Sequence, residues 1–226
     1  PGEGVLSWDR GAFQVPSTAT VRLLDDGLRG QSTATVRLLA GNSTNSLTLT
    51  LRATAAPNQF TGSVMLVSSP AGAGQLQVAD GDVLRAVYTD AQPAGLREAQ
   101  ATIDNAPPGI SDVVTLAQFG RVNIRWLASE PSTSRVYYGT TNAVTNVVED
   151  LAYRTAARLE LPALEPGNTY FLRVVATDRA GNSATNDNGG FFHRVVAPRP
   201  ATALLVYTPE AIFTELLAET PYPGIE

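Results

Sequence analysis

The sequence predicts an all-β protein that consists of two tandem antiparallel β-sandwiches, followed by a short strand and helix. Three observations support this fold class. Apolar residues alternate with threonine, arginine and other polar residues in many short runs, which is the period of a half-buried strand. Glycine, asparagine, aspartate and proline separate these runs. A double proline within 105–109 (NAPPG) divides them into two sets.

The first set of runs fills the first hundred residues. The octapeptide STATVRLL occurs at 17–24 and again at 32–39, and in both copies alanine, valine and leucine share one face. Further strands of this unit are expected at 47–51, 64–67, 76–78, 83–88 and 99–103. About seven short strands without a helical pattern are typical of a sandwich.

The two octapeptides suggest that they pair with each other. In an antiparallel hairpin between 17–24 and 32–39, Val21 would lie opposite Val36, and small apolar residues would meet large ones. No second copy of the surrounding sequence exists. The repeat therefore indicates a pair of strands rather than a solenoid or a recognition code.

The second set of runs predicts a second sandwich. Its strands are expected at 112–116, 121–127, 134–138, 154–161, 169–178 and 191–196. Prolines at 107–108 and within 198–200 interrupt the pattern, because proline lacks the backbone donor that a central strand needs. We therefore expect three parts: an Ig-like sandwich at 1–106, a second sandwich at 107–197 and a proline-bounded segment at 198–226.

The segment at 198–226 follows a different pattern. An apolar, strand-like run at 203–207 is followed by Thr208, Pro209 and Glu210, which suit an N-cap, a first helical position and the helix dipole. Four apolar residues share one face of the expected helix: Ile212, Phe213, Leu216 and Leu217. A strand and an amphipathic helix cannot bury themselves alone. The segment is either the start of a further α/β domain or a tail that docks on another surface.

Four motifs in the second unit carry a family resemblance: IRW at 124–126, RVYYG at 135–139, LEPGNTY at 164–170 and DRAGN at 178–182. With them, residues 107–197 resemble a fibronectin type III domain. The resemblance implies that the hydroxyl of Tyr170 hydrogen-bonds back to the backbone at the corner before the sixth strand. Trp126 is expected in the core of this sandwich. Domains of this family mostly space, present or bind other molecules.

Two stretches of the first unit carry a second resemblance, FTGSV at 60–64 and DGDVLRAVYTD at 80–90. With them, residues 1–104 look like an Ig-like repeat of large secreted bacterial proteins, which often lies beside peptidase domains. The resemblance implies an accessory module of an extracellular protein and no reaction of its own.

The composition excludes several functions. A net charge of −5 argues against nucleic-acid binding, and no apolar run reaches the length of a membrane span. All 16 basic residues are arginines. Functions that need a lysine Schiff base or the lysine of a P-loop are therefore excluded. There is no cysteine for a disulfide or a thiolate nucleophile. The chain begins with proline rather than methionine, so we expect it to be part of a longer protein.

The single histidine, His193, limits acid–base catalysis. A Ser-His-Asp site would have to combine it with residues such as Ser183 and Asp178. The alternative is a histidine on the face of a strand, which we favour because no complete catalytic set is evident. We therefore expect that the chain is not an enzyme and has no catalytic residues.

Asparagine and aspartate crowd the loop that follows 169–178. Asp178, Asn182 and Asp187 are candidate calcium ligands, because calcium takes six to eight oxygens from carboxylates, amides and backbone carbonyls. The loop lacks the spacing of an EF-hand, and the same residue types suit a turn between two strands. Calcium is the one cofactor that the sequence suggests.

Two more acidic groups occur at expected turns. One contains Asp25 and Asp26, and the other contains Asp80, Asp82 and Asp90. We expect them to be solvated turn residues, with calcium ligation as the alternative.

The aromatic residues Trp8, Trp126, Tyr137 and Tyr138 raise the alternative of an exposed platform that binds carbohydrate by stacking. The two tyrosines are adjacent in an expected strand, so at most one of them points inward. The sequence Asn42-Ser43-Thr44 also fits a glycosylation acceptor.

Together these features predict a non-catalytic structural or spacer module of a larger secreted or cell-surface bacterial protein, accessory to a hydrolase such as a peptidase. Its expected partners are other domains of the same polypeptide. Two alternatives stay open. One is an adhesion module that binds a carbohydrate or a protein ligand, and the other is a self-assembling surface or filament subunit whose segment at 198–226 joins a neighbouring copy.

Overall fold

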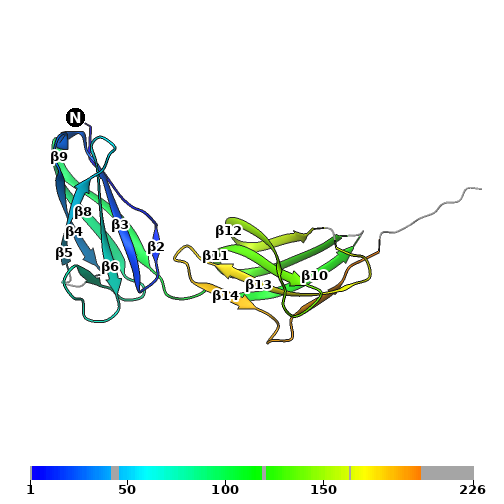
Figure 1. The fold of residues 1–226 in the computed structure, drawn as a ribbon. Helices are drawn as coiled ribbons and strands as arrows, with labels where there is room; N and C mark the ends of the chain where they lie inside the picture. Colours follow the sequence, from blue (N-terminus) through cyan, green and yellow to red (C-terminus); the bar gives the residue numbers. More distant parts are fainter. Residues whose placement is uncertain (1, 42–45, 119–120, 163, 200–226) are drawn as a thin grey trace, which may run out of the picture.

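The computed structural model describes residues 2–41, 46–118, 121–162 and 164–199. It consists of two all-β units that follow one another along the chain and lie end to end (Figure 1). The all-β fold class is therefore confirmed. Within the described residues, the one helix is a 3-10 turn at Asp26–Leu28, and no helix there is long and apolar enough to cross a membrane. The strand and helix expected in 198–226 fall at residues outside the described part of the chain.

The first unit is one hydrogen-bonded sheet that curls into two facing layers around a single core. One layer contains β1 (Val5–Trp8), β3 (Ser17–Leu24), β6 (Gln59–Val67) and the short β7 (Gln75–Gln77). The other layer contains β5 (Ser46–Ala53), β4 (Thr33–Ala40), β8 (Val83–Ala91), β9 (Ala94–Ile103) and the short β2 (Ala12–Phe13). β5 and β6 pair at only two positions, where the sheet passes from one layer to the other.

The expected hairpin between the two STATVRLL copies is wrong. The first copy is β3, which pairs with β1 and β6, and the second copy lies almost wholly in β4, which pairs with β5 and β8. The connection between them contains the 3-10 turn and crosses from one layer to the other. Val21 and Val36 are nevertheless buried in the same core. Each copy turns its apolar face inward, but from opposite layers.

The second unit contains β10 (Ile110–Gln118), β11 (Arg121–Gly139), β12 (Asn146–Leu161), β13 (Thr169–Thr177), β14 (Ser183–Asn186) and β15 (His193–Val196). β11 and β12 each belong to two layers. The first half of β11 pairs with β10 and with the second half of β12, whereas its second half pairs with β13 and with the first half of β12. The register shifts between Leu127 and Ser134, around Pro131, which cannot donate to a ladder. The strands expected at 121–127 and 134–138 are therefore two halves of one strand.

The core of the second unit supports the features that the family resemblance implied. Trp126 is buried, as expected, together with Ile124 and Leu172. The backbone N–H of Glu165 donates to the hydroxyl of Tyr170 at 3.1 Å, so the expected tyrosine corner is confirmed. The corner fixes the turn that leads from β12 into β13.

The chain enters and leaves each unit at opposite ends. Gly4 lies beside the β8–β9 turn, because its N–H donates to Asp90, whereas Asp104 follows the other end of β9. In the second unit Asp178 follows the end of β13 that faces the first unit, and Val196 pairs with Thr169 at the far end. The chain thus runs lengthwise through both units (Figure 1).

Candidate functional site

Three carboxylates converge where the two units meet. Asp104 follows β9, Glu130 lies in the middle of β11, and Asp178 follows β13. One carboxylate oxygen of each lies within 4.8 Å of an oxygen of the other two. We call this group the junction triad. Of its members, only Asp178 was a candidate ligand from the sequence.

Asp178 is the fixed member of the junction triad. Its side chain is buried, and its Oδ1 accepts hydrogen bonds from the backbone N–H groups of Gly181 (2.7 Å) and Asn182 (2.9 Å). Its Oδ2 accepts a third hydrogen bond, from Nδ2 of Asn182 (2.8 Å). The turn needs glycine at position 181, where φ is +101°. The DRAGN motif therefore folds into a tight turn around its own aspartate.

Asn182 joins this turn to the first unit. Its Nδ2 also donates to the backbone carbonyl of Asp104 at 2.8 Å. The next linker residue, Asn105, donates its N–H to Asp80 (2.8 Å) and accepts the N–H of Val15 through Oδ1 (2.7 Å). Hydrogen bonds from both units therefore hold the start of the linker in place.

In the junction triad, the negative charge of Glu130 is the one that its surroundings disfavour. Burial raises the pKa of its carboxyl, and the negative charges of Asp104 and Asp178 raise this pKa further. The Glu130 carboxylate has no hydrogen-bond partner among the described residues. A proton or a divalent cation would relieve the repulsion. Three carboxylates suit calcium, which would take about three to five further oxygens from backbone carbonyls and water.

Of the three expected calcium ligands, the structure joins two directly. Asp178 and Asn182 bond to each other, but Oδ1 of Asp187 accepts the N–H of Gly190 (2.9 Å), and Asp187 is not a member of the junction triad. Calcium binding by Asp178, Asn182 and Asp187 stays a prediction. The junction triad gives Asp178 a different set of partners, which only the tertiary fold assembles.

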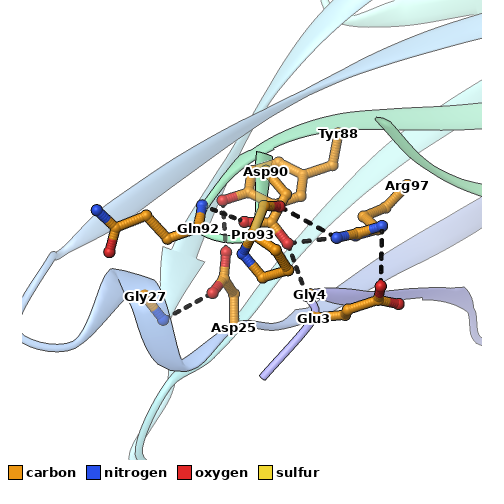
Figure 2. Close-up of polar contacts among 9 residues, drawn as sticks. All are labelled: Glu3, Gly4, Asp25, Gly27, Tyr88, Asp90, Gln92, Pro93 and Arg97. Carbon is orange, nitrogen blue, oxygen red and sulfur yellow. Dashed lines mark hydrogen bonds and ion pairs between the residues drawn. The ribbon is translucent and has the colours of Figure 1, made fainter. Parts of the chain in front are cut away.

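Asp25 and Asp90 form a second acidic group at the other end of the first unit. For these two residues the expectation of solvated turn acids is wrong, whereas Asp26 and Asp80 are exposed as expected. Asp25 and Asp90 are both 2 % exposed. Figure 2 shows the hydroxyl of Tyr88 donating to Oδ2 of Asp25 (2.6 Å) and the N–H of Gly27 donating to Oδ1 (2.7 Å). Burial and the hydrogen bond to Asp25 both raise the pKa of Tyr88 well above its usual value.

Asp90 holds the N-terminal segment of the chain in the same network. It accepts hydrogen bonds from the N–H of Gly4 (2.8 Å), the N–H of Gln92 (2.9 Å) and Nε of Arg97 (3.2 Å) (Figure 2). The bond from Gly4 contributes most to lowering the pKa of Asp90, against the opposing effect of burial. All four carboxylate oxygens of Asp25 and Asp90 accept protein donors, so the network acts as a structural clasp.

Asp80 and Asp82, which were grouped with Asp90 from the sequence, lie instead at the linker end of the first unit and also accept backbone hydrogen bonds. Asp82 accepts the N–H of Ala79 at 2.8 Å, and Asp80 accepts the linker N–H of Asn105. Both therefore stabilise turns near the junction.

His193 lies on β15 and contacts Oδ1 of Asn186 through Nε2 at 3.0 Å. Burial lowers its pKa, and the charge of Asp187 opposes this change. The hydroxyl of Ser183 bonds instead to that of Thr177 at 2.7 Å, and Asp178 bonds within its own turn. The candidate partners of a catalytic histidine thus have other contacts, which agrees with a histidine on a strand face.

Of the aromatic residues named from the sequence, Trp8, Trp126 and Tyr138 pack with the cores. Trp8 is half-buried, donates Nε1 to the carbonyl of Ala99 (3.1 Å) and meets Phe13 edge-on. Tyr138 is buried, whereas Tyr137 is half-buried on the other face under the guanidinium of Arg173. The opposite orientation of the two tyrosines is confirmed. The glycosylation acceptor at 42–44 lies outside the described residues.

No protein-family model matches the chain, and a search of curated proteins finds no relative. Among solved structures, the chain is similar to the chicken CNTN1 FN1–FN3 domains, with a TM-score of 0.44 and 13 % identity over 84 % of this chain; it spans 65 % of that chain's length. It is also similar to a cytokine receptor complex, with a TM-score of 0.35 and 14 % identity over 88 % of this chain and 98 % of that one. Both TM-scores are below 0.5, so neither likeness identifies a function. A function has to be inferred from the residues of this chain.

Proposed function

We propose that the chain is a non-catalytic spacer module of a larger secreted or cell-surface bacterial protein, with domains at 1–106 and 107–197. The hydrogen-bonded junction is the observation that carries this proposal. Asn182 ties the second unit to the backbone at Asp104, and Asn105 ties the linker to the first unit. A linker held from both sides transmits orientation, which a spacer needs and a flexible tether lacks.

The path of the chain supports the same proposal. β9 has 10 residues and β13 has 9, and a strand rises about 3.3 Å per residue, so each unit is roughly 30 Å long. Two units end to end hold the segments on either side of the module about 60 Å apart. The resemblance of the first unit to Ig-like repeats that often lie beside peptidase domains suggests that a hydrolase, such as a peptidase, lies in the same polypeptide.

Small-angle X-ray scattering of the 226-residue chain tests this proposal. A compact chain of this length has a radius of gyration of about 17 Å, and we expect a clearly larger value with a rod-like profile. Asn182→Ala removes the bond to the backbone of Asp104 and should broaden the distribution of end-to-end distances. Asn146→Ala, an exposed residue on β12, is the matched control and should leave the profile unchanged.

Two results would contradict the spacer proposal. A compact profile would show that the units fold against each other. Specific retention on a glycan array, or assembly that grows with concentration in light scattering, would instead identify a binding module or a self-assembling subunit.

A further inference from the structure

The outer face of the layer formed by β10, the first half of β11 and the second half of β12 is apolar and exposed. Val114, Leu116 and Leu127 are 39 %, 48 % and 47 % exposed, and a shallow groove of about 620 Å³ runs along them. Isolated exposed leucines are common, but three large apolar side chains in one groove form a continuous surface that a partner can cover.

Two arginines on this face lack a counter-charge. Arg125 and Arg158 lie directly opposite each other on β11 and β12, and both are exposed. Like charges in this position are destabilising. Arg158 reaches only Oδ1 of Asn123 (3.4 Å), and Arg125 has no ion pair or hydrogen bond with any described residue. The face therefore combines apolar side chains with unneutralised positive charge, in a chain whose net charge is −5.

Other charged groups around the groove do not neutralise this pair. Arg121, beyond one end of the groove, forms an ion pair with Glu160 at 3.2 Å. Asp112, at the opposite end, accepts a hydrogen bond from the hydroxyl of Ser111 at 3.2 Å. The two central arginines thus stay available to an incoming carboxylate.

We propose that residues 208–219 of the same chain dock in this groove as a helix. The segment 200–226 contains four glutamates and no basic residue. At 100° per residue, Glu210 and Glu219 flank the apolar stripe formed by Ile212, Phe213, Leu216 and Leu217. The stripe matches the exposed leucines and valine of the groove, and the two flanking glutamates are opposite in charge to Arg125 and Arg158.

The chain leaves the second unit at a position from which this segment can reach the groove. The N–H of Ala197 donates to the carbonyl of Asn168, in the loop between β12 and β13. That loop follows Leu161, which pairs with Val122 at the same end of the layer. The nine residue steps from Arg199 to Thr208 span up to roughly 30 Å. The part of β10 that lines the groove, between positions 111 and 116, is about 16 Å long. The connection is therefore long enough to bring residue 208 to the groove.

A docked helix would extend the function proposed above without depending on it. It would cover the exposed apolar face and neutralise the arginine pair. It would also fix the direction in which any following segment leaves the second unit, so that the far end of the module, like the junction, transmits orientation.

Paramagnetic broadening in the full chain tests the docking. The chain has no cysteine, so Thr220→Cys accepts a single nitroxide label without further changes. We expect strong broadening of the methyl signals of Val114, Leu116 and Leu127. Methyl signals of Leu96 and Met65, which are exposed on the first unit, should stay sharp.

Charge reversal separates docking from mere proximity. Arg125→Glu with Arg158→Glu should reduce the docked population about tenfold and sharpen the groove signals. Adding Glu210→Arg and Glu219→Arg to that variant should restore the broadening. Arg22→Glu with Arg29→Glu, two exposed arginines on the first unit, changes the net charge equally and should have no effect.

Three outcomes would overturn the proposal. The first is a folded spectrum without broadening at the groove. The second is broadening that survives the reversal of Arg125 and Arg158. The third is broadening that arises only between spin-labelled and isotope-labelled copies in a mixed sample, which would assign the groove to a second copy of the chain. If the double reversal weakens folding, Arg125→Gln with Arg158→Gln gives the same comparison.

Discussion

Replacing Tyr88 by phenylalanine tests whether the clasp of the first unit stabilises the fold. The hydroxyl of Tyr88 donates to Asp25 at 2.6 Å, and Asp25 is 2 % exposed (Figure 2). The variant keeps the ring and deletes one of the two hydrogen bonds that the carboxylate accepts. The N–H of Gly27 remains as the other donor.

The size of the effect follows from burial and charge. A hydrogen bond to a charged group contributes about 1.5–3 kcal/mol, and a carboxylate cut off from water cannot replace the lost donor. For a unit of about 100 residues, each kcal/mol lowers the melting temperature by roughly 4–8 °C. We therefore expect Tyr88→Phe to lower the melting temperature of the first unit by about 6–24 °C.

Differential scanning calorimetry, with tryptophan fluorescence to assign the transitions, measures this change. Each unit contains one tryptophan, Trp8 in the first and Trp126 in the second, so the two unfolding events have separate reporters. Tyr153→Phe is the matched control, because Tyr153 is 43 % exposed. A Tyr88→Phe variant that melts within about 2 °C of the parent would refute the stabilising role of the clasp.

Three further predictions concern the second unit and the junction. Tyr170→Phe should destabilise the second unit by about 1–2 kcal/mol, measured by urea unfolding, because the N–H of Glu165 loses its acceptor; an unchanged midpoint would count against the corner. The folded state raises the pKa of Glu130, so its ionisation costs stability as pH rises above the ordinary value of 4.5. Glu130→Gln should therefore raise the melting temperature near neutral pH and not in acid, and equal gains at both would disprove the repulsion. Calcium should raise the melting temperature and a chelator should reverse the gain. Loss of that response in Glu130→Gln would assign calcium to the junction triad and loss in Asp187→Asn to the loop, whereas a parent chain without any response would remove both.

Local sequence pattern was sufficient to predict the fold class and the inward face of most strands. Alternation along 17–24 and 33–40 identifies which residues enter the core, because side-chain direction in a strand depends only on position. The resemblance to fibronectin type III domains also predicted the tyrosine corner, in which Glu165 and Tyr170 lie five residues apart in one turn. These features arise within a few residues of each other.

Strand partners were not predictable in the same way. The two STATVRLL copies present the same apolar face, and that face is equally compatible with a hairpin and with two opposed layers. The connection between the two copies decides between a hairpin and two opposed layers. In this connection Asp25 caps the 3-10 turn at Asp26–Leu28, and the chain turns away from β3. An octapeptide pattern contains no information about this turn.

The buried acids were mispredicted for a related reason. Asp25 sits in a DDG sequence that favours an exposed turn, and its side chain does bond the N–H of Gly27 as such a turn requires. Its burial comes from Tyr88, which is 63 residues away in sequence. The residue thus keeps its local role in the turn, while a distant strand removes it from water.

The junction combines both situations, and for this reason only part of it could be found from the sequence. Asp178 and Asn182 belong to one local turn, and that turn satisfies Asp178 with three hydrogen bonds. The amide of Asn182 still has one hydrogen left, and it goes to the backbone of Asp104 rather than to a side chain. A bond to backbone depends on where the linker lies and not on which residue occupies it. Changes in the length of the linker should therefore disturb the orientation of the two units more than substitutions within it.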